Sequence, residues 1–504
     1  MAAGSSYSIV EYFGGDDGYR CGYCKNEKGN FSHGMWSHTM TVQDYQDLLD
    51  RGWRRSGKYV YKPIMNKTCC PQYTIRCHAL KFQPSKSHKK ILKKMNKFLF
   101  VGEIPEGQCD GEPMDSVCHE SGPARDSSQL SASEVEGPIN PPDVDKGAET
   151  NSAAPEPPRQ EAGPPANAKA TRSAPIPGVG ADPSRPPCRK AKELRKERRM
   201  QKEQRRQQEA GDTATSSSSS SVPAPAPAPA PTTANQTKSL EEFLSETTPD
   251  SPLHRLEVRL VPVSFEDPEF VATYERSAAL YSKYQQAIHG DDPSECGETE
   301  YKRFLCDSPL EVETAADGPE LGYGSFHQQY WLDGRLIAVG VIDVLPSCVS
   351  SVYLYYHPDF SNLSLGVYSA LREIAFTRQL QKQSPKLCHY YLGFYIHSCP
   401  KMRYKGQYLP SDLLCPETFT WVPIEQCVPR LDASAYARLN QDGQAVDTRA
   451  LRELGRALVL FRRTVMPYAA YTRKCKGSGD EPEVEQYAQL VGQPCAERIL
   501  LYRA

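Results

Sequence analysis

Four cysteines near the amino terminus constrain the fold of this 504-residue chain more than any other feature. Cys21 and Cys24 have the two-residue spacing that lets two thiolates reach one metal ion from a tight turn. Cys69 and Cys70 form a second pair, and Pro71 restricts the backbone directly after it. Any one of the four could be an ordinary buried cysteine, but two close pairs favour a shared metal site. Tetrahedral zinc and a cubane 4Fe–4S iron–sulfur cluster both accept four thiolates, so the sequence leaves both open.

The charge of the chain limits how it could bind a nucleic acid. A formal net charge of −2 excludes a uniformly basic surface, so any such contact must be local. A local candidate lies between the cysteine pairs, at residues 51–57, Arg-Gly-Trp-Arg-Arg-Ser-Gly. Because cations interleaved with aromatic side chains are typical of nucleic-acid contact, we expect Arg54 and Arg55 to contact an RNA backbone.

Composition and the chain's ends also bear on the compartment. Seventeen cysteines in 504 residues are too dilute for a small disulfide scaffold. The first residues show neither the basic nor the apolar region of a signal peptide, and no apolar run approaches the roughly 20 residues that span a bilayer. We therefore expect a soluble intracellular protein without membrane contact, whose thiols are reduced or metal-bound.

Three regions follow from the patterning of the chain. Residues 1–102 predict a small α+β metal-binding domain, in which Thr41 caps a helix over 41–50. Residues 103–238 predict a long disordered linker, because they are rich in Pro, Ser, Glu, Ala and Gly and have almost no aromatic side chains. Its basic segment, 189–206, is a charged linker helix, a nuclear signal or an RNA-binding arm. Order resumes at a capping box that starts with Ser239, so 239–504 forms the second domain.

The second domain contains a βαβ pattern. Residues 334–345 and 349–357 predict strands, 363–381 a helix and 388–396 a third strand, parallel to the second. Such units place ligands at the carboxyl ends of the strands, beside the start of the helix. Gly366 allows close approach there, which favours a phosphate site; the alternative is a simple cap by Ser361 or Ser364.

Several charged side chains are candidates for chemistry in this domain. Lys401, Arg403 and Lys405 recur at period two, so in an extended segment they would share one face, either to bind an anion or as a solvated edge. Asp343 interrupts an apolar strand and needs a cation, either a structural arginine or a substrate amine or guanidinium. His327 is either a base that contacts substrate or a packed histidine.

With these residues in hand, the chain resembles the arginyl-tRNA–protein transferases. The resemblance covers both ordered regions and not the linker. In sequence order its motifs are Cys21-x-x-Cys24, the 51–57 loop, Cys69-Cys70-Pro71, Gly324-Ser-Phe-His-Gln, Ile342-Asp-Val-Leu-Pro-Ser-Cys-Val-Ser-Ser351, Ser364-Leu-Gly366, and Tyr391-Leu-Gly-Phe-Tyr-Ile through Met402-Arg-Tyr-Lys405.

The resemblance implies a GNAT-like acyltransferase core behind an N-terminal cysteine domain. It implies transfer of arginine from Arg-tRNA to the terminal amine of proteins that begin with Asp, Glu or oxidised Cys, which marks them for ubiquitin-dependent degradation. It makes the cysteine quartet regulatory or structural, with an iron–sulfur cluster or zinc, and it implies a location in cytoplasm and nucleus. The candidate catalytic residues are Asp343, His327 and Tyr404, and the candidate substrate-binding residues are Lys401, Arg403, Lys405, Ser347, Gly366, Arg54 and Arg55.

The residues are consistent with that reaction. Aminoacyl-tRNA is already an activated ester, so no nucleotide cofactor is needed, and we find no Walker or GxSxG motif. Two alternatives stay open: a metal-dependent RNA-binding adaptor without catalysis, and an acetyltransferase of the GNAT class that uses acetyl-CoA. The second would need a pyrophosphate loop, which residues 362–367 do not supply cleanly. The oligomeric state is left open.

Overall fold

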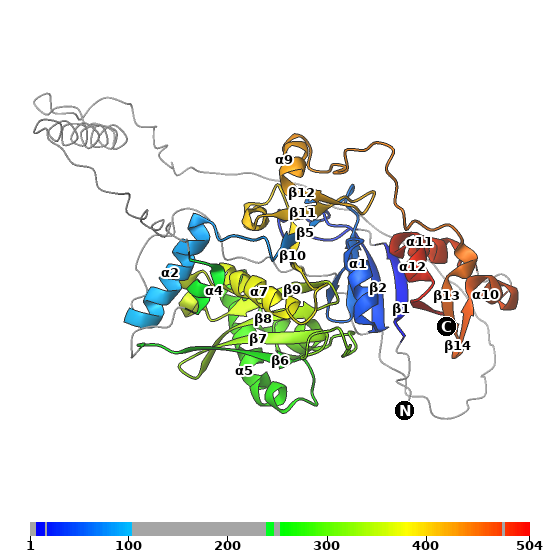
Figure 1. Ribbon diagram of the computed structural model, residues 1–504. Helices are drawn as coiled ribbons and strands as arrows, with labels where there is room; N and C mark the ends of the chain where they lie inside the picture. Colours follow the sequence, from blue (N-terminus) through cyan, green and yellow to red (C-terminus); the bar gives the residue numbers. More distant parts are fainter. Residues whose placement is uncertain (1–6, 16–17, 103–237, 246–251, 476–478, 504) are drawn as a thin grey trace, which may run out of the picture. The chain divides into compact units, whose positions relative to one another are not determined.

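A computed structural model of the chain describes residues 7–15, 18–102, 238–245, 252–475 and 479–503. The predicted linker falls outside these ranges except for its last residue, and so does its basic segment 189–206. The described residues form two mixed β-sheets with helices packed around them (Figure 1). This confirms an α+β fold.

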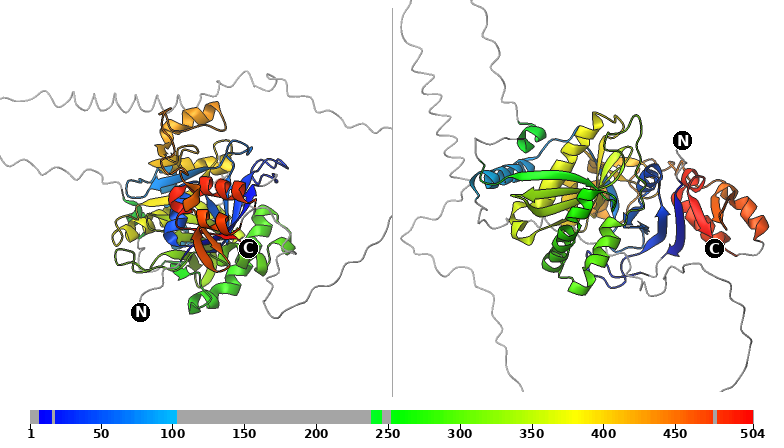
Figure 2. Two further views of the ribbon diagram at one scale, coloured as in Figure 1. Left: turned by 90° about the vertical axis from the view of Figure 1, so that its right-hand side faces the viewer. Right: turned by 90° about the horizontal axis from the view of Figure 1, so that it is seen from below.

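The first sheet joins the two ends of the described chain. Its order is β14-β13-β15-β1-β2-β4-β3, and β1 pairs in parallel with β15 and antiparallel with β2. The first strands therefore lie beside the last ones, as two further views show (Figure 2). The strands of this sheet are β1 (Ile9–Gly15), β2 (Ser32–Thr39), β3 (Arg54–Ser56), β4 (Tyr59–Pro63), β13 (Leu458–Phe461), β14 (Thr464–Pro467) and β15 (Leu500–Arg503).

The second sheet carries the predicted βαβ unit. Its order is β12-β11-β5-β10-β9-β8-β7-β6, so β5, from the N-terminal region, pairs between β10 and β11. Strands from 7–102 and from 252–503 thus pair within both sheets. The strands of the second sheet are β5 (Tyr73–His78), β6 (Leu256–Pro262), β7 (Gly324–Leu332), β8 (Arg335–Val344), β9 (Cys348–Tyr356), β10 (His389–Tyr395), β11 (Ser411–Leu414) and β12 (Trp421–Pro423).

The βαβ prediction is confirmed. Strands β9 and β10 pair in parallel and are connected by α7 (Leu365–Gln381). Helix α7 is buried on several sides, because it packs on β9 and β10 and is covered by α2 (Lys86–Val101) and α4 (Leu240–Leu244). Helix α5 (Pro268–Tyr284) covers the other face of the sheet through β8 and β9 (Figure 1).

The parallel pairing between β9 and β10 is short. It holds from Cys348 opposite His389 to Ser350 opposite Tyr391, and beyond this point no further pair is formed between the two strands. Strand β10 is irregular here, since its register with β5 shifts after Tyr391 and Gly393 adopts a left-handed φ of 81°. The sheet therefore opens toward the carboxyl ends of β9 and β10.

Local capping signals are confirmed where they can be checked. The Thr41 hydroxyl accepts from the backbone N–H of Asp44 at the start of α1 (Val42–Leu49), and Ser239 and Glu242 form the predicted capping box of α4. The remaining helical segments are η2 (Gln285–His289), η3 (Pro293–Glu295), α6 (Glu298–Tyr301), η4 (Lys302–Cys306), η5 (Pro358–Leu363), α8 (Pro400–Arg403), η6 (Tyr404–Gln407), α9 (Ile424–Ala433), η7 (Leu454–Arg456), α10 (Tyr468–Lys474), α11 (Glu481–Val491) and α12 (Gln493–Ala496). Among the described residues, no helix combines the length and apolar character needed to cross a membrane.

Candidate active site and metal centre

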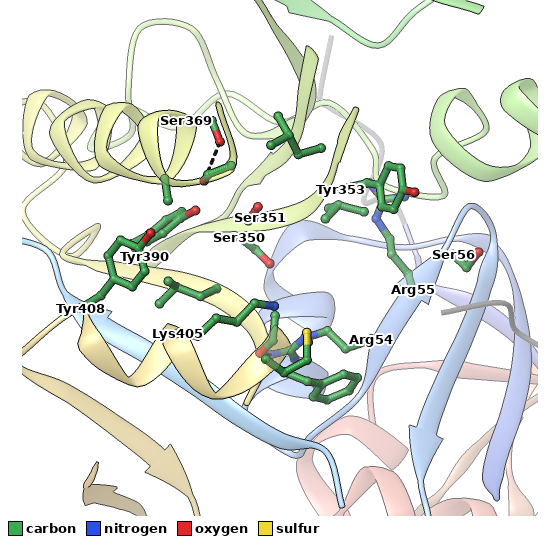
Figure 3. A pocket seen from close by; sticks show the side chains of 18 of the residues that line it. Arg54, Arg55, Ser56, Ser350, Ser351, Tyr353, Ser369, Tyr390, Lys405 and Tyr408 are labelled. Atoms are coloured by element: carbon green, nitrogen blue, oxygen red, sulfur yellow. Dashed lines mark hydrogen bonds between the residues drawn. The ribbon is translucent and has the colours of Figure 1, made fainter. Parts of the chain in front are cut away.

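A pocket lies where β9 and β10 separate, beside the start of α7 (Figure 3). Its floor comes from Ser350 and Ser351 of β9 and from Tyr390 of β10, while Gly366 and Ser369 of α7 line one side. This is the position that the βαβ pattern predicts for a ligand. The start of α7 offers backbone N–H groups but no side-chain cap: the N-cap residue, Ser364, has φ 55° and makes no capping hydrogen bond, so the capping alternative is wrong.

Besides Arg55, the pocket is lined by Arg54 and Lys405, two cations far apart in the sequence. Arg54 donates from Nη2 to the backbone oxygen of Gly393 at 3.2 Å, and its guanidinium lies 5.0 Å from the ring centre of Phe394. Lys405 is only 7% exposed and extends toward Arg54 across the pocket (Figure 3). The pocket is therefore electropositive at a place that water reaches poorly.

Residues 400–405 are helical and not extended. Pro400 begins α8, as proline commonly does at a first helical position, and η6 follows directly. At about 100° per residue, positions two apart point to different sides of a helix. Lys401 and Arg403 are exposed, with Arg403 at 3.5 Å from an Asp432 oxygen, so the predicted common face with Lys405 is wrong.

The buried carboxylate of Asp343 is held by an arginine. Arg55 donates from Nη2 to Oδ1 at 2.6 Å and from Nε to Oδ2 at 2.9 Å, and the Ser325 hydroxyl donates to Oδ1 at 2.8 Å. Burial by itself would lower the pKa of Arg55, but the Asp343 charge and hydrogen bond raise it overall. Of the two predicted cations, the structural arginine is the one observed.

The arginines of the 51–57 segment are buried in the described structure. Arg51, Arg54 and Arg55 are 2%, 6% and 5% exposed, and Arg51 pairs with Asp447 at 2.7 Å. Both guanidinium groups are enclosed by protein, so contact of Arg54 and Arg55 with an RNA backbone stays a prediction. Arg54 and Arg55 line the pocket.

The remaining candidates divide between the pocket and its surroundings. His327 is buried against Phe270, its Nε2 lies 3.2 Å from the backbone oxygen of Leu305, and burial lowers its pKa to about 4. Ser347 lies in the β8–β9 turn, where its N–H donates to the Gln46 side chain at 3.4 Å. The candidates that line the pocket are Arg54, Arg55, Gly366, Tyr404 and Lys405, and those that do not are Asp343, His327, Ser347, Lys401 and Arg403.

The sequence analysis does not predict a role for Glu373, a buried acid behind the pocket. Glu373 of α7 is fully buried and accepts a hydrogen bond from the Tyr390 hydroxyl at 2.6 Å. Desolvation raises its pKa to about 7, with hydrogen bonds from Tyr390 and Ser351 acting in the opposite direction. The sequence does carry a signal for it, because Glu373 lies within the predicted helix over 363–381, among positions whose apolar neighbours indicate burial.

The four predicted metal ligands come together. The Sγ atoms of Cys21, Cys24, Cys69 and Cys70 all lie within 4.8 Å of one another, and those of Cys24 and Cys69 are 3.3 Å apart. The quartet can hold a metal ion, as predicted. Cys77, which is close to the second pair in sequence, does not belong to this cluster; it is buried on β5.

The quartet packs against the wall of the pocket. Cys21 and Cys70 belong to one apolar cluster with Phe394 and Met402, which also line the pocket. Tyr23, inside the Cys-x-x-Cys turn, lines the pocket itself. The cysteine quartet therefore packs behind the wall of the pocket, although its thiols do not line it.

Comparisons with known proteins agree with this arrangement. Residues 19–90 match the family described as arginine-tRNA-protein transferase, N terminus, and residues 276–415 match its C terminus. Arginyl-tRNA–protein transferase 1 of Drosophila melanogaster is 42% identical, over 98% of this chain and 99% of its own. Arginyl-tRNA–protein transferase 2 of Arabidopsis thaliana is 38% identical, over 83% of this chain and 76% of its own.

More distant matches cover part of the chain. An aspartate/glutamate leucyltransferase of Pseudomonas syringae pv. syringae is 33% identical over 35% of this chain and 66% of its own. A solved C-terminal domain of a putative lysylphosphatidylglycerol synthetase from Agrobacterium fabrum aligns with 33% of this chain and 48% of its own, but its TM-score of 0.20 and 9% identity are too low to bear on the fold.

The pocket and these matches define an aminoacyltransferase. The chain belongs to the arginine-tRNA-protein transferase family, as its motifs suggested. Family membership favours this class over the adaptor and the acetyl-CoA-dependent alternatives.

Proposed function

We propose that this enzyme, which transfers arginine from Arg-tRNA to protein, selects acceptors whose first residue is Asp, Glu or oxidised Cys. The observation that supports this is the pair of cations, Arg54 and Lys405, on the wall of a poorly hydrated pocket. A carboxylate or sulfinate of the acceptor's first residue would be held by charge-assisted hydrogen bonds, which are stronger than those to a neutral amide. The modified proteins would then enter ubiquitin-dependent degradation, in cytoplasm and nucleus.

The chemistry needs little beyond positioning. The acceptor's neutral amine attacks the carbonyl carbon of the arginyl ester, a C–N amide bond forms, and the C–O bond to the ribose breaks. The ribose oxygen leaves with a proton that the amine nitrogen gives up. Holding the two reactants together in one pocket supplies much of the rate, because it replaces a bimolecular encounter.

The geometry of β9 and β10 supports a GNAT-like core within this function. Two parallel strands separate, and the pocket occupies the gap, next to the start of the helix that connects them. The separation leaves backbone groups of β9 and β10 without partners in each other, so an extended acceptor peptide or the aminoacyl group can bind them.

We further propose that the cysteine quartet holds a single tetrahedral ion of the zinc type. With Zn–S bonds of about 2.3 Å, neighbouring sulfurs of a tetrahedron are about 3.8 Å apart. The four Sγ atoms all lie within 4.8 Å of one another, which is close to the sulfur–sulfur distance of such a tetrahedron. In a cubane cluster each thiolate binds a different iron atom and must stand further from the others. The ion would fix the chain around Tyr23 and support the pocket wall.

Labelled arginine transfer tests the proposal. Peptides that begin with Asp, Glu, sulfinic Cys, Asn or Ala are compared as acceptors from Arg-tRNA. We expect the first three to be modified and the last two to be poor acceptors, and we expect Lys405→Gln to reduce the preference for Asp over Asn at least tenfold. Lys401→Gln, at an exposed position of the adjacent helix, is the matched control and should leave the preference unchanged. Equal transfer to Asp and Asn peptides by the wild type, or an unchanged preference in Lys405→Gln, would refute the assignment.

A further inference from the structure

The outer face of α2 carries a dense stripe of lysines beside the pocket. The helix contains Lys86, Lys89, Lys90, Lys93, Lys94 and Lys97 within 16 residues and no acidic residue. Spacings of three and four place them on the side away from the core, since its buried residues are His88, Ile91, Leu92, Met95 and Phe98. The full chain has a net charge of −2, so this concentration of positive charge is local.

The concentrated positive charge destabilises helix α2. Lysines four residues apart repel one another, and cations in the first turn oppose the positive end of the helix dipole. Lys86, Lys89, Lys90 and Lys93 form no ion pair with a carboxylate of the described residues. A solvent-exposed helix face ordinarily carries both positive and negative side chains. On α2, a large bound anion would reduce the repulsion between the lysines.

Helix α2 borders the pocket at two points. Near its start, the ring of His88 stacks on Tyr408 with a centroid distance of 4.8 Å, and Tyr408 lines the pocket. Further along, Lys94 donates to the backbone oxygen of Asn362, just before α7 and its pocket-lining Gly366. Helix α2 also lies along α7 and α4 (Figure 1). Helix α2 therefore lies next to the pocket wall, and the stripe comes nearest to it at Lys94.

We propose that the lysine stripe of α2 binds the phosphate backbone of the tRNA acceptor arm and guides its aminoacylated end into the pocket. This rests on the proposed function of the pocket. Sixteen helical residues extend over about 24 Å, enough to follow several consecutive phosphates. An anionic membrane is the less suitable partner, because the apolar face of α2 is buried against α7 and is not available to enter a bilayer.

The test is a full-length variant with Lys86→Gln, Lys89→Gln, Lys90→Gln and Lys93→Gln. Glutamine keeps the helix propensity of lysine and removes only the charge. The probe is a tRNA specific for arginine without its amino acid, titrated at 50–200 mM NaCl. We expect affinity at 100 mM salt to fall about 10–100-fold and the slope of log affinity against log salt to become shallower by about 2–4. The KM for Arg-tRNA should rise, while kcat at saturation and the KM for the acceptor peptide stay within twofold.

The matched control removes three cations from another basic site. Arg276, Lys283 and Arg335 line a groove on the α5 side of the sheet, away from α7. Their replacement by glutamine should leave tRNA affinity within twofold. The proposal is overturned if the α2 variant binds tRNA as the wild type does, if both variants weaken equally, or if the α2 variant loses binding to phosphatidylserine vesicles but not to tRNA. Failure of the function itself would appear differently, as a wild type that transfers no arginine.

A separate observation concerns the proton that the acceptor must lose. Glu373 is fully buried, forms no ion pair with a cation of the described residues, and shares hydrogen bonds with Tyr390 and Ser351, which both line the pocket. Its Oε1 lies over Gly340, where an added Cβ would be only 3.0 Å away. A carboxyl group is thus built into the back of the pocket and is connected to it by a hydroxyl.

We infer that Tyr390 and Glu373 form a relay that deprotonates the acceptor's terminal ammonium group. The ammonium N–H bond breaks, Tyr390 takes that proton as its own hydroxyl proton passes to Oε2 of Glu373, and the amine is left neutral. The proton on Glu373 returns to solvent after the amide has formed. A burial-raised pKa near 7 suits a proton acceptor at neutral pH.

Two variants test the relay, Glu373→Gln and Tyr390→Phe, with wild-type tRNA and peptide affinities required as a check on folding. We expect kcat at pH 7 to fall about 100-fold. The pH profile of kcat should lose the ionisation near 7 and keep that of the acceptor amine, and Glu373→Asp should restore part of the rate. A folded Glu373→Gln enzyme with the wild-type kcat and pH profile would show that the residue is only structural.

Discussion

Removing the carboxylate charge of Asp343 should destabilise the protein severely without acting on the chemistry. The side chains of Asp343 and Arg55 are 0% and 2% exposed, and two charge-assisted hydrogen bonds of 2.6 and 2.9 Å join them. Asp343→Asn leaves the Arg55 charge buried without its carboxylate partner. Breaking one side of such a pair costs about 3–5 kcal/mol.

The assay is urea unfolding of Asp343→Asn, Arg55→Met and the double variant Asp343→Leu/Arg55→Met. Because an apolar pair of similar volume avoids the desolvation of both charges, the double variant should regain most of the loss, with a coupling energy of at least about 2 kcal/mol. Asp317→Asn is the control: its pair with Lys386 is exposed on both sides, so its loss should cost less than about 1 kcal/mol. An Asp343→Asn protein that is as stable as the wild type but has lost kcat would refute the structural reading and return Asp343 to the chemistry.

Three further predictions concern the metal, a titrating acid and a glycine. Cys24→Ser should lose bound metal, measured by elemental analysis, and lower arginine transfer, whereas Cys77→Ser, on β5, should keep the metal; metal retention by Cys24→Ser would contradict the four-thiolate site. Burial raises the pKa of Glu373 to about 7, so its neutral form is the favoured one: this contribution to stability is complete below about pH 4.5 and is lost as pH rises through 7. Glu373→Gln should therefore gain up to about 3 kcal/mol over the wild type between pH 5 and pH 8 in urea unfolding, and a gain independent of pH would disprove this. Gly57→Ala should cost more than about 2 kcal/mol, because φ is 59° and the new Cβ would lie 2.0 Å from the backbone oxygen of Arg303; thermal unfolding at the wild-type midpoint would show the contact to be unimportant.

Most predictions that depended on neighbours in sequence were confirmed. The caps at Thr41 and Ser239, the period of the helix over 363–381 and the parallel strands around it follow from contacts within a few residues. The spacing of Cys21 and Cys24 likewise reflects the reach of two thiolates from one turn. The lysine spacing of α2 is also visible in the sequence, although the sequence analysis makes no prediction from it.

Where a prediction depended on distant partners, it was incomplete or wrong. The sequence does not show that Arg55 is the partner of Asp343, because the two lie 288 positions apart. One local prediction also failed: the common face of Lys401, Arg403 and Lys405 requires an extended chain, whereas Pro400 begins a helix that separates them. The sequence does not single out Glu373, since only the packing of α7 on the sheet brings it to Tyr390 and leaves it without an ion pair to any cation of the described residues.

The sequence by itself determined the cysteine quartet, the βαβ unit and, through its motifs, the family. These are set by short-range geometry: turn spacing, helix period and strand alternation. Only the tertiary structure decided which charges are used up inside the protein and which face the pocket. A charge is stabilised by the nearest opposite charge in space. For the buried Arg51 and Arg55 that partner comes from hundreds of residues away, because strands from both ends of the chain pair within the same two sheets.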